Sequence, residues 1–250
     1  MAEAAQAIGI AAQVAQATGD IKLNQRQLVE AARQAVLRGD LTRAMEDYQA
    51  SLTLAEALDE QKQRSVILNL MADVLVKRRD FAEAMRLCEQ SLALTEALGD
   101  VQGKSDTLAN MATVLKRWGG LTGAMCLYKE ALDLKEELGD IQGKSATLHQ
   151  MATVLETRGD LAGAMSLYEQ SLAIDEALGD VQGKSATLVN MAGIQFRQGD
   201  YETALDKART SLNLLQTMGA TADAAQEVAA LIQQIEAVQA DEFTRPGAEE

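Results

Sequence analysis

Apolar residues recur every three or four positions along most of the chain, a spacing that places them on one face of a helix. In residues 141–180 they form two groups, Leu148, Met151, Ala152 and Leu155, then Leu161, Ala164, Met165, Tyr168, Leu172 and Ile174. Gly159-Asp160 separates the groups and Gly179-Asp180 follows them. Glycine accepts the left-handed conformation that ends a helix, and aspartate caps the next one. The pattern therefore predicts two helices joined by a short turn.

This pattern repeats with a period of forty residues. Residues 101–140 and 141–180 are identical at 23 of 40 positions, and weaker copies occupy 21–60, 61–100 and 181–220. A single helix pair buries too little surface to offset its ordering entropy, whereas stacked copies share their faces. We therefore predict five stacked repeats. In the second repeat Arg79 takes the place of the turn glycine, so this turn is expected to be looser or more strained.

Composition agrees with an all-α fold. Aromatic residues make up 3% of the chain, and the one proline, Pro246, lies near the C-terminus. Sandwiches and barrels depend on aromatic and β-branched strands with Pro/Gly turns, so an all-β fold is excluded.

The repeats resemble the tetratricopeptide repeat family, through Leu148, Met151-Ala152, Leu155, Gly159-Asp160, Leu161, Ala164 and Tyr168. The usual family repeat has 34 residues, so the forty-residue period resembles a longer class, found in spindle-orientation scaffolds (LGN-like) and bacterial signalling-ATPase sensor arrays. The resemblance implies an all-α, right-handed α-solenoid of stacked antiparallel helix pairs. It also implies a protein–protein interaction scaffold.

The two ends are expected to cover the stack. Residues 7–20 align with the second half of a repeat, so residues 1–20 are predicted to form a half-repeat or capping helix. Residues 221–240 predict a C-terminal capping helix with Val228, Leu231, Ile232 and Ile235 inward, and 241–250 predict a disordered acidic tail.

Charge and cysteine content narrow the range of partners. A formal net charge of −14 argues against nucleic-acid binding, which needs an extensive positive face. Two cysteines cannot form a disulfide framework, and no apolar run is long enough to span a membrane. A cytoplasmic protein, monomeric or weakly dimeric, is expected, with neither nucleic acid nor membrane as partner.

No set of residues predicts catalysis. Gly-Lys-Ser occurs at 103–105, 143–145 and 183–185, but three residues instead of four separate it from the preceding glycine, and a helix replaces the strand of a phosphate loop. The single histidine, His149, excludes a histidine pair, and neither cysteine has a second cysteine or a histidine at ligand spacing. We predict no enzyme activity, no cofactor and no metal site; an enzyme that uses the Gly-Lys-Ser turns is the least favoured alternative.

The resemblance implies a ligand-binding concave face on the first helices. Carried over by position, the candidate peptide-binding residues are Arg33, Asn69, Asp73, Lys77, Thr113, Lys116, Arg117, His149, Thr153 and Arg197. The alternative is that these positions form a solvent-exposed surface whose residues vary from repeat to repeat without a binding role. Cations gather in the first helices of repeats one to three, so an acidic peptide or helix is the expected ligand. Two other hypotheses stay open: a self-associating structural assembler, and a sensor or partner subunit of a larger bacterial signalling or protease system.

Overall fold

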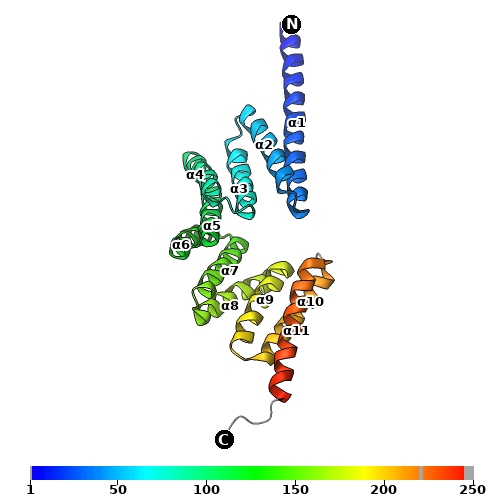
Figure 1. The fold of residues 1–250 in the computed structure, drawn as a ribbon. Coiled ribbons are helices and arrows are strands. Elements are labelled where there is room, and N and C mark those ends of the chain that lie inside the picture. The colour runs from blue at the N-terminus through cyan, green and yellow to red at the C-terminus, as the bar shows by residue number, and fades with distance from the viewer. Residues whose placement is uncertain (1, 220–221, 245–250) are drawn as a thin grey trace. The chain divides into compact units, whose positions relative to one another are not determined.

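A computed structural model describes the backbone of residues 2–219 and 222–244, and the side chains of 17–219 and 224–240. The described residues form helices joined by short turns (Figure 1). The helices are α1 (Ala2–Leu37), α2 (Leu41–Ala57), α3 (Gln61–Lys77), α4 (Phe81–Leu98), α5 (Val101–Trp118), α6 (Leu121–Leu138), α7 (Ile141–Thr157), α8 (Leu161–Leu178), α9 (Val181–Arg197), α10 (Tyr201–Thr217) and α11 (Ala222–Thr244). The predicted all-α solenoid of repeated helix pairs is confirmed.

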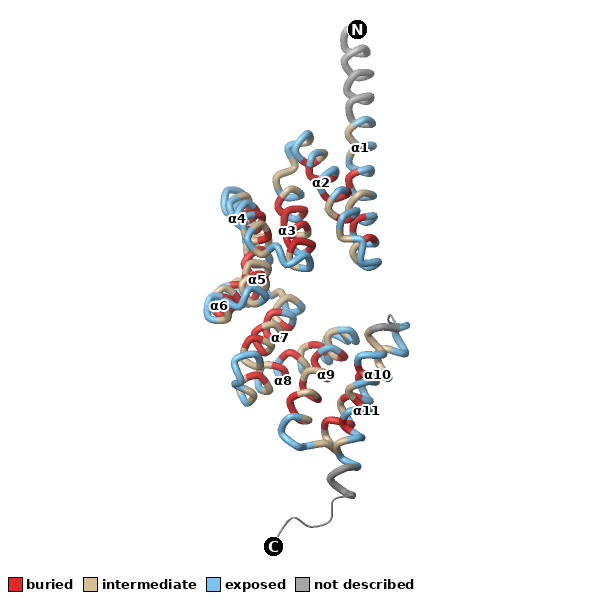
Figure 2. The backbone as a smooth tube through the Cα atoms, in the orientation of Figure 1, coloured by how far each residue is buried: buried red, intermediate tan, exposed pale blue. Residues whose placement is uncertain are grey.

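The chain divides into two compact units, residues 1–134 and 135–250. In unit one, α1 packs on α2, α2 on α3, α3 on α4 and α4 on α5, and the first helices α3 and α5 also touch. In unit two, α7 packs on α8, α8 on α9, α9 on α10 and α10 on α11. Within each unit, buried residues line the faces between neighbouring helices and exposed residues cover the outer faces and turns (Figure 2).

The turns follow the glycine–aspartate pattern. Gly159 has a φ of 84°, and the Asp160 side chain accepts a hydrogen bond from the Gly163 N–H at 2.9 Å, which caps α8. Two turns use other residues in the left-handed conformation, Asp59 (φ 52°) and Arg79 (φ 64°). Arg79 is thus a site of backbone strain, as its place in the repeat predicted.

The start of the chain differs from the predicted boundary. The half-repeat of 1–20 and the first helix of repeat one join into the single helix α1, which runs through Gly19-Asp20 without a break. Gly19 lacks the positive φ of the other turn glycines, and glycine is compatible with a helical backbone when no turn demands otherwise. Side chains before residue 17 lie outside the described part.

The core joins the two helices of each repeat through small and apolar side chains. Tyr48, Cys88, Tyr128 and Tyr168 occupy one repeat position, and all are at most 2% exposed. Beside them, buried serines link first to second helices, for example Ser145 to Ser171 at 2.9 Å and Ser185 to Ser211 at 2.8 Å between hydroxyl oxygens. Small hydroxyl side chains let the helices approach closely while their polar atoms remain hydrogen-bonded.

At the C-terminal end, α11 covers α10 with Val228, Ile232 and Ile235, which are 0–9% exposed. The inward face predicted for this segment is therefore present. The tail predicted for 241–250 is helical up to Thr244, and residues 245–250 lie outside the described part. None of the described helices has a stretch both long and apolar enough to cross a membrane.

Candidate functional site

Two neighbouring hollows lie between the first helices of unit one. The first, about 360 Å³, is bounded by α1, α2 and α3 and is here called the apolar hollow. Its lining consists of Arg33, Val36, Leu37, Tyr48, Leu70, Asp73, Val74 and Lys77. The second, about 550 Å³, is bounded by α3, α4 and α5 and is here called the cationic hollow. Its lining consists of Asp73, Val76, Lys77, Arg79, Phe81, Thr113 and Arg117. Because Asp73 and Lys77 line both, the hollows form one groove.

Helical spacing and the forty-residue period bring these side chains together. Asp73 and Lys77 lie one turn apart on α3, and Thr113 and Arg117 occupy the same two repeat positions on α5. Residues four apart share a helix face, so both pairs point into the space between the helices. Five of the predicted residues thus meet in the groove, with Arg33 at its α1 side.

The carboxyl group of Asp73 sits where the two hollows meet. Its side chain is open to water, yet the surrounding helices withdraw enough solvent to raise its pKa to about 6, against the lowering effect of Lys77. Tyr48 and Cys88 are close enough to Asp73 for its charge to raise both of their pKa values, after the larger effect of burial. The groove therefore contains one acid that titrates near neutral pH.

Three cations of the cationic hollow form no ion pair with the side chains that the structure describes. Among the described side chains, Lys77, Arg79 and Arg117 have no carboxylate within ion-pair distance. The lysines of the Gly-Lys-Ser turns behave differently: Lys104 contacts Glu96 at 2.9 Å and Lys184 contacts Glu176 at 2.7 Å. In a chain with 37 acidic and 23 basic residues, unpaired cations around one hollow indicate a surface suited to anions.

Two further candidates of unit one lie outside the groove lining. Asn69 is buried, and its amide donates to the Thr107 hydroxyl at 2.9 Å, so it serves the contact between α3 and α5. Lys116 is half-buried; burial first, and Arg117 second, lower its pKa to about 8. Thr113 does line the cationic hollow, but its hydroxyl already bonds to Tyr128 at 2.7 Å.

The candidates of unit two are engaged with neighbouring side chains. His149 lies 3.0 Å from the Thr187 hydroxyl and 3.3 Å from the Asn190 amide, and its ring packs edge-on against Tyr168. Arg197 pairs with Glu156, and the Thr153 hydroxyl donates to the Gln150 carbonyl. These three residues do not share a hollow: of the three, only His149 lines the hollow between α7, α8 and α9.

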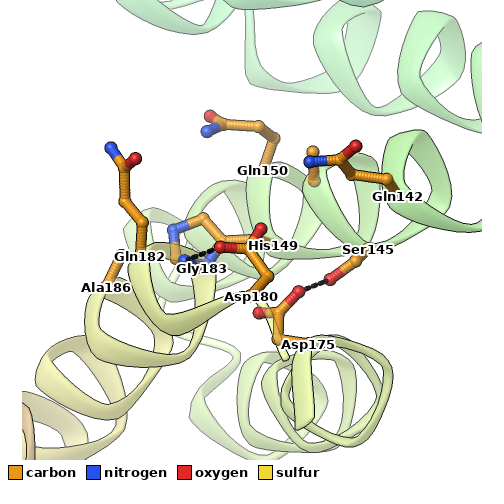
Figure 3. A pocket seen from close by; sticks show the side chains of 10 residues that line it. Gln142, Ser145, His149, Gln150, Asp175, Asp180, Gln182, Gly183 and Ala186 are labelled. Atoms are coloured by element: carbon orange, nitrogen blue, oxygen red, sulfur yellow. Dashed lines mark hydrogen bonds between the residues drawn. The ribbon is translucent and has the colours of Figure 1, made fainter. Parts of the chain in front are cut away.

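Unit two has a smaller polar hollow of about 310 Å³ between α7, α8 and α9 (Figure 3). Ser145 and Asp175 point toward one another and share a hydrogen bond, while Asp180 accepts from the Gly183 N–H at 2.9 Å. Burial raises the pKa of Asp175, and the Ser145 hydrogen bond lowers it. Because its acids are used by internal hydrogen bonds, we interpret this hollow as part of the packing between helices. Among the described residues, no group of three or more His, Cys, Asp or Glu side chains is arranged to hold a metal ion.

Sequence reasoning missed Arg79, Phe81 and Tyr48 as groove residues. They come from a turn and from second helices, whereas only first-helix positions were carried over. The replacement of the turn glycine by Arg79 was the available signal.

Comparisons with known proteins agree with this architecture. The family model described as tetratricopeptide repeat matches residues 63–137 and 144–217, more than half of the chain. None of the curated proteins compared with the chain matches it.

Solved structures resemble the chain at low sequence identity. Aspartyl phosphate phosphatase F from Bacillus subtilis superposes with a TM-score of 0.75 at 11% identity, over 93% of this chain and 61% of that one. A Rap protein complexed with competence and sporulation factor gives 0.73 at 13% identity, over 86% and 65%. A signal transduction ATPase with numerous domains and a tetratricopeptide repeat sensor, from Pyrococcus horikoshii, gives 0.67 at 16% identity, over 84% and 34%. The chain thus spans less than two thirds of each of these proteins, and the likeness establishes the fold.

Proposed function

The chain belongs to the tetratricopeptide repeat family, whose repeats generally act in protein–protein interactions, and we propose that it is a non-enzymatic scaffold. Its ligand in this proposal is an acidic peptide segment of a partner protein, bound in the groove of unit one. The observation that carries the proposal is the joint lining of the groove by Arg33, Lys77, Arg79 and Arg117 around an apolar floor. Among the lining residues only Asp73 is acidic.

The two hollows suit different parts of one ligand. Val36, Leu37 and Leu70 offer apolar surface beside Arg33, which suits an apolar side chain next to an acidic one. The cationic hollow attracts carboxylates, and cations in a concave surface act together more strongly than scattered ones. An acidic segment with an interspersed apolar residue therefore matches the groove in shape and charge.

The comparisons support this proposal at the level of the fold. A Rap protein with a similar fold was solved with competence and sporulation factor bound, and a similar repeat array is the sensor of a signalling ATPase. A role as sensor or partner subunit in a larger signalling system is the second candidate, and it is favoured by the same likeness.

The test is charge reversal in the groove. Native partners are first captured from cell extract on the wild-type protein and identified by mass spectrometry. Lys77→Glu with Arg117→Glu is then compared with Arg158→Glu with Lys207→Glu, which changes the charge equally in unit two. We expect the groove variant to lose acidic partners and the control to retain them, with circular dichroism confirming that both fold. Equal capture by both variants would contradict the groove as the site.

A further inference from the structure

The turn between α3 and α4 carries a backbone strain that the fold does not require. Arg79 has a φ of 64°, a conformation that the equivalent turns assign to Gly39, Gly119, Gly159 and Gly199. A side chain in this region clashes with its own backbone, so glycine is the favourable residue here. Strained residues that persist in a fold tend to cluster at functional sites.

The strained residue contributes a guanidinium group to the cationic hollow. Arg79 lines it together with Lys77 and Arg117, and none of the three is paired with a described carboxylate. A glycine at position 79 would relieve the strain but would remove one of these three cations. The strain is therefore explained if the arginine side chain is needed in the hollow.

Charge and geometry indicate what kind of anion fits. Three cations against the single acid Asp73 leave an excess of two positive charges in the hollow. A carboxylate carries one negative charge, whereas a phosphate monoester carries about −1.5 to −2 at pH 7 and three acceptor oxygens. Two planar guanidinium groups and one ammonium group match these oxygens, since arginine forks bind phosphate in a bidentate manner.

An apolar surface lies beside the cations. Phe81 lines the same hollow, and its ring stacks against Trp118 with centroids 6.4 Å apart. Trp118 is 56% exposed although it is the largest side-chain type in the chain. The peptide residue next to a bound phosphorylated side chain would therefore contact aromatic surface, a contact that inorganic phosphate cannot make.

We propose that the cationic hollow recognises a phosphorylated side chain within an acidic peptide segment, with Arg79, Lys77 and Arg117 binding the phosphate and the Phe81–Trp118 pair contacting the adjacent residue. This inference rests on the proposed function and narrows it: the partner is recognised in its phosphorylated form.

The experiment compares three labelled peptide pools with identical randomised flanks and a fixed central phosphoserine, glutamate or serine. Binding to the full chain is measured by fluorescence anisotropy at pH 7.5 and constant ionic strength, with inorganic phosphate as a competitor. We expect the phosphoserine pool to bind at least about tenfold more tightly than the glutamate pool, and the serine pool to bind most weakly. Inorganic phosphate should compete only at much higher concentration than the phosphopeptides.

Arg79→Gly separates the role of the side chain from that of the fold. It should reduce phosphoserine binding about tenfold while raising resistance to urea, a combination that a merely structural role of Arg79 would not produce. Asp59→Gly is the matched control, because Asp59 is the other non-glycine residue with positive φ among the described residues and lines neither hollow. It should increase stability and leave binding unchanged.

The outcomes distinguish the two proposals. Equal binding of the phosphoserine and glutamate pools, both weakened by Lys77→Glu, overturns phosphate recognition and leaves acidic-peptide binding in place. Equal binding of all three pools overturns both. If inorganic phosphate competes at the same concentration as the phosphopeptides, the peptide and its contact with the Phe81–Trp118 pair contribute nothing to affinity, and this part of the proposal is overturned.

Discussion

At the scale of single residues, Arg79 is where stability and binding are expected to oppose one another. A non-glycine residue in the left-handed conformation destabilises the folded state by roughly 1–2 kcal/mol. Replacing it by glycine relieves this strain, but glycine loses more conformational entropy on folding, which offsets part of the gain. Arg79→Gly should therefore raise the free energy of unfolding by about 0.5–1 kcal/mol, measured by urea denaturation. A lower free energy of unfolding in this variant would show that the side chain stabilises the turn and that the strain is compensated within the fold.

Asp73 is expected to give the groove its pH dependence. Its pKa is raised to about 6, so lowering the pH from 7.5 to 5.5 neutralises most of its charge, while the carboxylates of an acidic peptide, with a pKa near about 4, stay ionised. The basic residues that line the groove with it are Arg33, Lys77, Arg79 and Arg117, so neutralising Asp73 removes the one negative charge among the lining side chains. Binding of an unphosphorylated acidic peptide should therefore strengthen as the pH falls.

The control variant is Asp73→Asn. It should bind as tightly at pH 7.5 as the wild type does at pH 5.5, with little pH dependence between these values, as measured by titration calorimetry. If the variant keeps the wild-type pH dependence, another group is responsible; Lys116, whose pKa is about 8, would be the next to test.

At the scale of helices, two glycines of α9 are expected to respond oppositely to alanine. Gly193 is in the helix with no atom within 4 Å of an added Cβ, so Gly193→Ala should stabilise by about 1 kcal/mol through helix propensity. A Cβ at Gly183 would lie 2.8 Å from a carboxylate oxygen of Asp175, which is 3% exposed and bonded to Ser145. Gly183→Ala should destabilise by about 1 kcal/mol because the clash outweighs propensity. Equal stabilisation by both substitutions, measured in urea, would contradict the close packing of Gly183 against Asp175.

Helix α11 is expected to stabilise the C-terminal end of unit two. Ile235 is fully buried against α10 and α9, so Ile235→Ala should lower the free energy of unfolding by about 2–4 kcal/mol. Gln234→Ala, at an exposed position of the same helix, should change it by less than about 0.5 kcal/mol. Similar effects of the two substitutions would mean that α11 does not act as a cover in solution.

The helices and most turns could be predicted from the sequence because apolar spacing and Gly-Asp pairs directly determine them. The continuity of α1 through Gly19 could not be predicted, because glycine is compatible with both a turn and a helix. Packing against neighbouring helices selects between them, and the sequence pattern does not reveal that packing. The same limit applies to side chains that point toward the next repeat. Asn69 and His149 bond to Thr107 and Thr187, each 38 residues later, and such pairs depend on how consecutive repeats stack.

At the scale of the whole molecule, the groove could be located from the sequence only along the first helices. The forty-residue period places Asp73 with Thr113 and Lys77 with Arg117, and the structure brings these four together. The contributions of Tyr48, Arg79 and Phe81 depend on the angle between helices, which periodicity does not encode.

The expected assembly state rests on the covered C-terminal end of unit two and on the charge of the chain. A net charge of −14 repels identical copies, and α11 covers α10. We expect a monomer or weak dimer by light scattering at physiological salt. A stable higher oligomer in dilute solution would favour the self-associating assembler instead.

Hydrogen–deuterium exchange of the protein with its captured partner shows where the partner segment binds. If it binds in the groove of unit one, amide exchange slows at the α3–α4 turn and at the end of α5, around residues 73–81 and 113–118, and does not change around 142–150 and 175–186. Protection confined to those segments of unit two, or to α11, with unchanged exchange around the groove, would contradict binding in the groove.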